Sequence, residues 1–467
     1  MGAGIAKALS AMENKTDDDE ISSSSAVQPA HTSTLAPAVK SASPSVIQRS
    51  QQTDAADCLI VGAVAIDLTC DLTHGVLDKQ SSWIHTSNPG AIHRTPGGVG
   101  FNVCLATAYA SSHDTIVRMI SAVGPDARDL PAALNLAASA TSPDLSGVIV
   151  VDDGRTAQYI AMHDCKGDLI LACADMALVE KLSPAHIKSE FARAGKSPFW
   201  VGVDANLDQE PLSTAILCAR EAGAKVLLEP TAVMKAQTIL QLSHVGVTSV
   251  LPNPPTVDVM TPNSIELEGL FSHARDLGLF ERQDWWDVID AMGTTTEFRT
   301  AIAWMARECG VMGPVVEKGL VQMAVHLLPF MPNLFVKMGE LGVITVQLAK
   351  ETEVRGRMVG PGQLSTGPGF VMWRGGKIGG QGENMCILVR HHHGHKVTGE
   401  IVSVTGAGDS FAGVLLSELV AADKRGDLNI LADVDSVARI VDRAQRAAVL
   451  TLLSRFAISP EIKTLKD

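Results

Sequence analysis

Apolar runs and helical patterns alternate along most of this chain of 467 residues, and that alternation constrains the fold more than any other feature. The first folded segment, 58–67, is a nearly continuous apolar run, which is typical of a strand buried on both faces. Similar runs follow at 117–120, 147–151, 199–204, 225–229, 334–337, 342–348 and 385–389. Helical patterns lie between several of them, at 102–111, 184–194, 213–222, 285–309, 410–422 and 434–453. This order predicts an α/β fold with a doubly wound, mostly parallel central sheet and helices on both faces.

The composition argues against several classes of function. The net charge is −13 and aromatic residues make up 4% of the chain, so there is no electrostatic basis for binding nucleic acid and a small-molecule partner is favoured. No apolar run approaches the length of a membrane span, which predicts no membrane partner. The eight cysteines include no Cys-x-x-Cys pair, so we expect reduced thiols and a cytoplasmic setting.

Three segments depart from the alternating pattern. Residues 1–55 are predicted to be a disordered N-terminal segment with a short helix over 5–12, followed by one folded domain at 56–467. The glycine-rich stretch at about 350–382 is interpreted as a flexible surface insertion. The cluster His391–His395 could bind zinc, but no cysteine or carboxylate near it in the sequence completes a ligand set, so a solvated loop is favoured.

The turn at 404–409 combines a bare backbone with one carboxylate and leads into an apolar helix, predicted to begin at about Ser410. Gly406 and Gly408 permit positive φ and leave the N–H groups around Ala407 uncovered, which predicts an anion hole at the helix N-terminus. Asp409 would then accept the proton of an attacking hydroxyl. The alternative is that Asp409 is a simple helix N-cap, and the local residues alone do not decide between the two.

A second glycine-rich segment, 96–102, joins an extended stretch to a helix. Gly97 and Gly98 would bring the backbone close to a ligand, and Asn102 offers both a donor and an acceptor for vicinal hydroxyls. Asp67 follows the first strand, at the edge where open α/β sheets bind ligands. A plain tight turn at the glycines and an Asx-turn at Asp67 are the alternatives.

The third motif is Asn263-Ser264-Ile265-Glu266, after a proline that follows a strand end. Its two polar side chains would lie on one face of an opening helix turn, which suits a hydrated magnesium ion held through waters. A capping box, with Asn263 at the N-cap and Glu266 three residues later, explains the same residues and is favoured for this motif alone.

These three motifs, in the order glycine-rich segment, Asn263-x-x-Glu266 and Gly406-Ala407-Gly408-Asp409, resemble the ribokinase-like (PfkB-type) carbohydrate kinase family over about residues 58–460. The resemblance implies a ribokinase-like α/β fold with a small β lid near 68–96 and 147–172. It also implies ATP as phosphate donor and Mg²⁺ as cofactor. The segment 337–342 is similar to the family's Gly-x-x-Gly stretch beside the nucleotide, although Lys337 stands where the family usually has threonine.

The match assigns a role to each residue of the motifs. Asp409 would be the general base, and the amides of Gly406, Ala407 and Gly408 the anion hole. The remaining roles would be sugar binding for Asp67, Gly97, Gly98 and Asn102, nucleotide binding for Lys337, Gly339 and Gly342, and magnesium binding through water for Asn263 and Glu266. The resemblance also allows a homodimer through the lid.

Within the family, the segments 203–206, 228–231 and 445–452 resemble pseudouridine kinases more than ribokinases, fructokinases or adenosine kinases. The implied reaction is phosphorylation of the 5′-hydroxyl of pseudouridine. Two alternatives stay open: a kinase of this family acting on ribose, adenosine or fructose, and a nucleoside-binding protein of the same fold without turnover. In some eukaryotes such a kinase follows a pseudouridine-5′-phosphate glycosidase, and we expect the segment 5–12 to be the remnant of such an upstream domain.

Overall fold

The structure is a computed structural model, and it describes residues 45–46, 55–73, 87–128, 142–165, 169–194, 198–242, 250–251, 253–356 and 364–465. The helix expected over 5–12 and most of the N-terminal segment at 1–55 lie outside these residues. Within that segment, Ser45–Val46 is a strand, β1, that pairs antiparallel with β6. The prediction of disorder was therefore wrong for these two residues.

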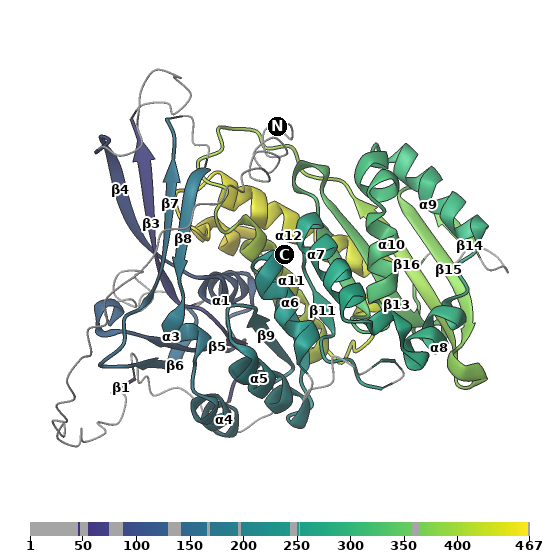
Figure 1. Ribbon diagram of the computed structural model, residues 1–467, viewed down its shortest axis with the longest axis horizontal. Coiled ribbons are helices and arrows are strands. Elements are labelled where there is room, and N and C mark those ends of the chain that lie inside the picture. Colours follow the sequence, from purple (N-terminus) through teal and green to yellow (C-terminus); the bar gives the residue numbers. More distant parts are fainter. Residues whose placement is uncertain are drawn as a thin grey trace, which may run out of the picture. The chain divides into compact units, whose positions relative to one another are not determined.

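A central sheet of twelve strands runs through the described part of the chain (Figure 1), in the order β1-β6-β5-β2-β9-β10-β11-β12-β13-β16-β15-β14. From β6 to β12 neighbouring strands are parallel, and from β12 onward they are antiparallel. The strands after β1 are β2 (Cys58–Val61), β5 (Val117–Val123), β6 (Asp144–Val150), β9 (Trp200–Asp204), β10 (Lys225–Glu229), β11 (Val259–Met260), β12 (Asn333–Lys337), β13 (Val343–Lys350), β14 (Leu364–Gly367), β15 (Phe370–Lys377) and β16 (Asn384–His392).

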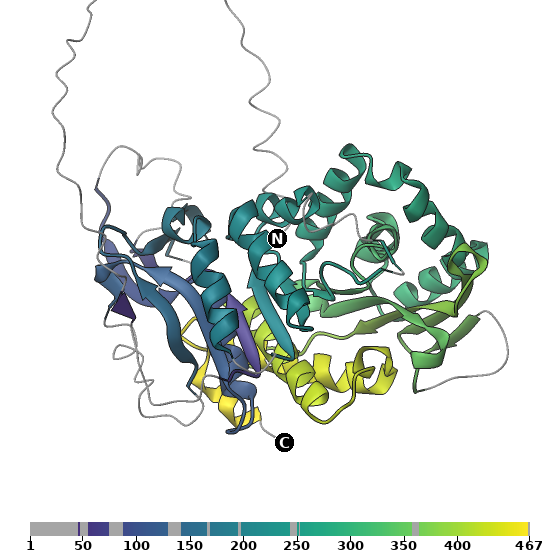
Figure 2. The ribbon, with the colours of Figure 1, turned by 90° about the horizontal axis from the view of Figure 1, so that it is seen from below.

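Helices cover both faces of this sheet, as the alternation of elements predicts (Figure 2). In β2, Leu59 and Val61 point into one hydrophobic core while Cys58 and Ile60 point into the other. The second core contains α1, α11 and α12, and the first contains most of the other helices. The helices are α1 (Val99–Ala110), α3 (Ala177–Glu180), α4 (Pro184–Arg193), α5 (Gln209–Glu221), α6 (Val233–Gln237), α7 (Ser264–Asp276), α8 (Gln283–Met292), α9 (Thr296–Glu308), α10 (Leu320–Leu327), α11 (Ala407–Lys424) and α12 (Val434–Leu452).

A separate four-stranded sheet has the order β4-β3-β7-β8. Its strands are β3 (Ala65–Leu72), β4 (Gly90–Gly97), β7 (Ala157–His163) and β8 (Leu169–Asp175). It occupies the region predicted as the lid, with one difference. Residues 147–150 belong to β6 of the central sheet, so the second part of the small sheet begins ten residues later than 147, at Ala157.

Two predicted elements differ from the structure for local reasons. The single helix expected over 285–309 is two helices, α8 and α9, because Gly293 adopts a left-handed φ of 56° and ends α8. The stretch at 350–382, interpreted as a surface insertion, contributes β14 and β15 to the central sheet. Trp373 of β15 is buried and donates its indole N–H to the carbonyl oxygen of Met292 at 2.9 Å, which ties this edge of the sheet to α8.

Helices α1 and α11 pack closely through Gly413, and this contact brings the two glycine-rich motifs together. The Thr107 hydroxyl of α1 donates to the carbonyl oxygen of Gly413 at 3.0 Å. A Cβ atom on Gly413 would lie 2.6 Å from the Cβ atom of Ala106 and 2.7 Å from the carbonyl oxygen of Val103. Glycine at 413 is therefore what lets the two helix backbones approach.

Substitution of Gly413 tests that close approach. We expect Gly413→Ala to lower the free energy of unfolding, measured by urea titration, by about 1–3 kcal/mol because the added methyl group overpacks the α1–α11 contact. Gly367→Ala is the matched control, since a Cβ atom there would meet nothing within 4 Å and no positive φ is required. Equal stability of the two variants would show that the helices are farther apart than described.

Candidate active site

The turn before α11 places Asp409 in the first turn of that helix. Gly406 is the N-cap residue with a φ of 80°, and a Cβ atom on it would overlap the carbonyl oxygen of Ala457. The helix begins at Ala407, three residues earlier than predicted, because this left-handed glycine turns the chain directly into the helix. The first N–H groups of a helix have no acceptor within it, so those of Gly406, Ala407 and Gly408, the predicted anion hole, are suited to an anion.

Asp409 accepts a hydrogen bond from the side chain of Asn102, with 2.8 Å between Nδ2 and Oδ2. Burial raises the pKa of Asp409 to about 6, while the Asn102 hydrogen bond and the Lys337 charge lower it and the Asp204 and Glu266 charges raise it. A carboxyl group with this pKa is ionised at neutral pH and remains basic enough to accept a proton. The predicted catalytic and sugar-binding motifs are therefore in direct contact.

Asp67 lies on the small sheet and interacts with Asp409. Its pKa is raised to about 7, first by burial and then by the negative charge of Asp409. A Cβ atom on Gly97 of the neighbouring strand would overlap the Asp67 carboxylate, so glycine at 97 makes room for this side chain. Asp67 was predicted to lie just past the end of one strand formed by the apolar run at 58–67. That prediction was wrong, because the run divides into β2 and β3 and Asp67 lies within β3.

Gly98 forms the entry to α1. It is the N-cap residue, with a φ of 95°, and a Cβ atom on it would lie 2.7 Å from the carbonyl oxygen of Ala63. The N–H of Phe101 donates to that same oxygen at 2.9 Å. The turn after β2 and the start of α1 are thus fixed to each other, and this contact orients Asn102 toward Asp409.

Asp204, at the end of β9, is a positioning residue; it lies in the segment 203–206 that resembles pseudouridine kinases, but the sequence pattern assigned it no role. Its carboxylate accepts the N–H of Ala63 at 2.7 Å and the N–H of Asn206 at 2.9 Å. A Cβ atom on Gly62 or Gly100 would lie 2.5 Å or 2.8 Å from one Asp204 oxygen. The available signal was a carboxylate at the end of an apolar strand, which resembles the pattern at Asp67.

Asn263 and Glu266 form a capping box at the start of α7. The Asn263 side chain accepts the N–H groups of Ile265 and Glu266, both at 2.9 Å, and Glu266 accepts the N–H of Asn263 at 2.8 Å. The structure thus contains the capping box that was favoured for this motif alone. Glu266 is nevertheless buried and close enough to raise the pKa of Glu229 and of Asp409 through its charge.

Lys337, at the end of β12, forms an ion pair with Glu229, at the end of β10, with 2.7 Å between Nζ and Oε1. The Thr261 hydroxyl donates to the other Glu229 oxygen. The Lys337 ammonium also lies at the turn, 3.3 Å from where a Cβ atom on Gly408 would be. Burial raises the pKa of Glu229 to about 7, which Lys337 opposes. The lysine that replaces the family's threonine therefore places a positive charge beside the predicted anion hole.

The two other predicted nucleotide-binding residues lie in the turn between β12 and β13. Gly339 is the first residue of a short 3₁₀ helix, η7 (Gly339–Leu341), and Gly342 follows its last residue; their φ values are 61° and 89°. A Cβ atom on Gly342 would overlap the carbonyl oxygen of His392, so the turn packs tightly against the end of β16. This turn follows directly from Lys337 and is thus joined to the site through β12.

The charges around Asp409 test whether the residues of this site fit a magnesium ion. Glu229, Glu266 and Asp409 interact electrostatically with one another, and the positive charge of Lys337 acts on Glu229 and Asp409. Three carboxylates facing one ammonium leave excess negative charge, which a divalent cation would offset. Oxygen ligands are also the kind that magnesium prefers, so the residues present fit this ion.

Comparisons with known proteins identify the fold. The central sheet and its helices match solved ribokinases, among them that of Cryptococcus neoformans var. grubii in complex with ADP, at a TM-score of 0.53 and 13% identity over 88% of this chain and 97% of that one. The fold is ribokinase-like. The fold class predicted from the sequence is confirmed, including the central α/β sheet with helices on both faces.

Two curated relatives are similar in sequence to this ribokinase-like chain. A pseudouridine-metabolizing bifunctional protein of Schizosaccharomyces pombe is 29% identical over 411 residues, which is 88% of this chain and 48% of that protein. The pseudouridine kinase of Escherichia coli is 24% identical over 219 residues, which is 45% of this chain and 60% of that protein. The predicted resemblance to pseudouridine kinases is confirmed, and the chain spans about half the length of the first relative. No protein-family model matches the chain.

The cysteines and the helices bear on two predictions about the setting of the protein. All eight cysteines are free thiols, as expected from their spacing, and Cys165 and Cys173 are exposed. Among the described residues, no helix has both the length and the apolar character needed to cross a membrane.

The raised pKa of Asp67 predicts a measurable pH dependence of stability. The ordinary value of 3.8 rises to about 7 in the folded protein, so the stability that the neutral carboxyl group contributes is lost as pH rises through about 7. We expect Asp67→Asn to lose less unfolding free energy than the wild type between about pH 5 and about pH 8 in urea titrations. Asp153→Asn, at an exposed position, is the control and should follow the wild type. Parallel curves for all three proteins would contradict the assignment.

Proposed function

We propose that this chain is an ATP-dependent kinase that phosphorylates the 5′-hydroxyl of pseudouridine. The observation that carries the proposal is the position of Asp409, which lies in the first turn of α11 beside helix N–H groups and is hydrogen-bonded to Asn102. A base and an anion-binding turn at one place are what in-line phosphoryl transfer requires. The names of the two curated relatives support pseudouridine as the substrate.

In the proposed reaction, the substrate hydroxyl oxygen forms a bond to the γ-phosphorus as the bond from that phosphorus to ADP breaks. Asp409 accepts the hydroxyl proton, and its pKa of about 6 keeps it ionised at neutral pH. The N–H groups at 406–408 stabilise the negative charge on the transferring group. Asp67 and Asn102 hold the ribose hydroxyls, which orients the 5′-oxygen toward Asp409.

The residues that would bind the nucleotide and the magnesium ion belong to the site described above. Gly339, Gly342 and Lys337 would hold the nucleotide, and the Lys337 ammonium beside Gly408 is suited to the phosphate charge. Asn263 and Glu266 would hold magnesium through water, and the ion supplies charge neutralisation to the phosphates when bound. The ADP in the Cryptococcus ribokinase complex supports a nucleotide for a protein of this fold.

The small sheet supports the homodimer that the family resemblance allows. Asp67 lies on one face of this sheet, and the opposite face carries Ile92, Ile160 and Leu171, which are exposed apolar side chains on three different strands. An exposed apolar face of this kind is typical of a protein interface. We therefore include dimerisation through this face in the proposal, and light scattering of the wild type and of Leu171→Glu tests it.

One assay separates the proposed substrate from the alternatives. ADP release is measured with magnesium and ATP over a panel of pseudouridine, uridine, adenosine, ribose and fructose. We expect release with pseudouridine far above release with the others. Release with another member of the panel would favour a different sugar or nucleoside kinase. Binding of pseudouridine without ADP release would favour a non-catalytic nucleoside-binding protein.

A further inference from the structure

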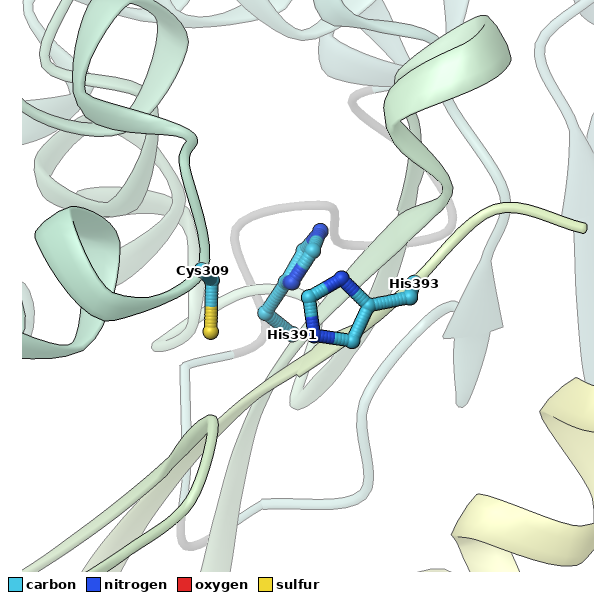
Figure 3. A group of neighbouring side chains, drawn as sticks. All are labelled: Cys309, His391 and His393. Carbon is cyan, nitrogen blue, oxygen red and sulfur yellow. The ribbon is translucent and has the colours of Figure 1, made fainter.

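Three metal-ligating side chains gather outside the kinase site, at the end of β16 (Figure 3). Cys309, His391 and His393 each present a ligand atom, and these atoms all lie within 4.8 Å of one another. Cys309 follows the last turn of α9, so it is more than eighty residues from the histidines in sequence. The structure thus supplies the cysteine whose apparent absence favoured a solvated loop for the histidine cluster.

His391 is the residue that points most clearly to a ligand. It is 4% exposed, and its Nε2–H donates to the carbonyl oxygen of Leu341 at 2.7 Å. A carbonyl oxygen can only accept, so Nε2 carries the proton and Nδ1 holds a lone pair. That Nδ1 atom is buried and has no hydrogen-bond partner. A metal-binding histidine is typically fixed by a backbone carbonyl on its other nitrogen in this way.

The backbone around the cluster explains why the three side chains meet. His391 and His393 are two residues apart on an extended segment, so they project to the same side, and their rings contact each other with centroids 4.6 Å apart. The backbone N–H of His391 donates to the carbonyl oxygen of Gly369 at 2.8 Å. A Cβ atom on Gly369 would lie 3.5 Å from the Cys309 sulfur, so glycine at 369 leaves that sulfur close to the strand.

We propose that Cys309, His391 and His393 bind one zinc ion. One thiolate and two imidazole nitrogens form a ligand set that zinc accepts, and the fourth position of a tetrahedral ion is left for water beside the exposed His393. Zinc bonds of about 2.0–2.3 Å would separate the ligand atoms by about 3.3–3.6 Å, so the cluster closes by at most roughly 1 Å when the ion binds. The Cys309 thiol releases its proton to solvent as the sulfur–zinc bond forms.

The zinc site is distinct from the proposed magnesium site and does not depend on the kinase activity. Its ligands are nitrogen and sulfur atoms, whereas magnesium prefers oxygen atoms. His391 also joins it to the turn at Gly339–Leu341 through the Leu341 carbonyl oxygen. His395, in the same histidine cluster, is not part of it because its Nε2 contacts the Asp442 carboxylate at 2.9 Å.

The affinity of the chelator-treated chain of 467 residues for Zn²⁺ tests the proposal. Competition with a chromophoric zinc indicator should give a dissociation constant that rises at least about 100-fold in Cys309→Ser and in His393→Gln, since even changes outside the ligand shell cost 10- to 100-fold. His395→Gln is the matched control and should bind like the wild type. Both ligand positions are at least partly exposed, so the variants are expected to fold, and circular dichroism verifies this.

Two further readouts identify the ligands directly. Substitution with Co²⁺ should give a thiolate-to-cobalt charge-transfer band that Cys309→Ser abolishes. Zinc should also protect Cys309 from alkylation by iodoacetamide, while the exposed Cys165 and Cys173 stay reactive as internal controls. Equal Zn²⁺ affinity in the wild type and the double variant Cys309→Ser/His393→Gln, or an equal loss in His395→Gln, would overturn the assignment.

Discussion

Replacing Asp409 with asparagine is expected to lower kcat by about 100- to 10,000-fold while the KM for pseudouridine changes little. Asparagine keeps the size of the side chain and can still bond to Asn102, but it cannot accept the proton of the attacking hydroxyl. Burial and the neighbouring charges hold the pKa of Asp409 at about 6, so the wild-type value of kcat/KM should fall as pH decreases through that value. Steady-state kinetics over a pH series measures both effects.

The control for this variant is Asp276→Asn, an exposed aspartate at the end of α7 that forms a surface ion pair with Arg275. It should keep the wild-type kcat and the wild-type fall of kcat/KM at acidic pH. A turnover close to normal in Asp409→Asn would remove Asp409 from the role of general base. A large rise in KM with unchanged kcat would instead make it a binding residue.

Replacing Lys337 with methionine is expected to cost about 3–5 kcal/mol of unfolding free energy near pH 8, because Glu229 would be left buried without the ammonium group that stabilises its charged form. Glu229 is almost completely inaccessible, and even with Lys337 present its pKa is raised to about 7. Loss of Lys337 raises that pKa further, so the cost should shrink as pH falls toward about 7, below which Glu229 is protonated in the folded state of both proteins. Urea titrations at several pH values measure this.

The double variant Lys337→Met/Glu229→Gln separates the ion pair from simple packing. It removes the unpaired charge, so it should recover most of the stability lost in Lys337→Met. Lys318→Met, at an exposed position outside the cluster, is the control for loss of a lysine and should change stability little. A double variant as unstable as Lys337→Met would show that the lysine stem, rather than its charge, supports the fold.

Much of this architecture is predictable from the sequence because local patterns encode it. The apolar run at 58–67 and its successors predict buried strands, and the glycines at 97, 98, 406 and 408 predict turns that need close backbone approach. The order of the motifs then predicts that Asn102 and Asp409 belong to one site, and their side chains are in hydrogen-bonding contact across 307 residues of sequence.

Other features depend on contacts that no local pattern contains. Lys337 and Glu229 come from different strands, and only the strand order of the sheet brings their side chains together. Asp204 gains its role from the close approach of Gly62 and Gly100. The glycine-rich stretch near 350–382 has the composition of a surface loop, yet its apolar segment at 370–373 pairs with β16 and packs beneath α8 and α9. Tertiary packing outweighs local propensity in these cases.

The most direct test of the central claim is the identity of the phosphorylated product. The purified chain of 467 residues is incubated with magnesium, ATP and pseudouridine, and the products are followed by ³¹P nuclear magnetic resonance and mass spectrometry. We predict that pseudouridine 5′-monophosphate forms in equal amount to ADP. ATP that remains intact, or a phosphate that appears on water or on a ribose hydroxyl other than the 5′ position, would contradict the account.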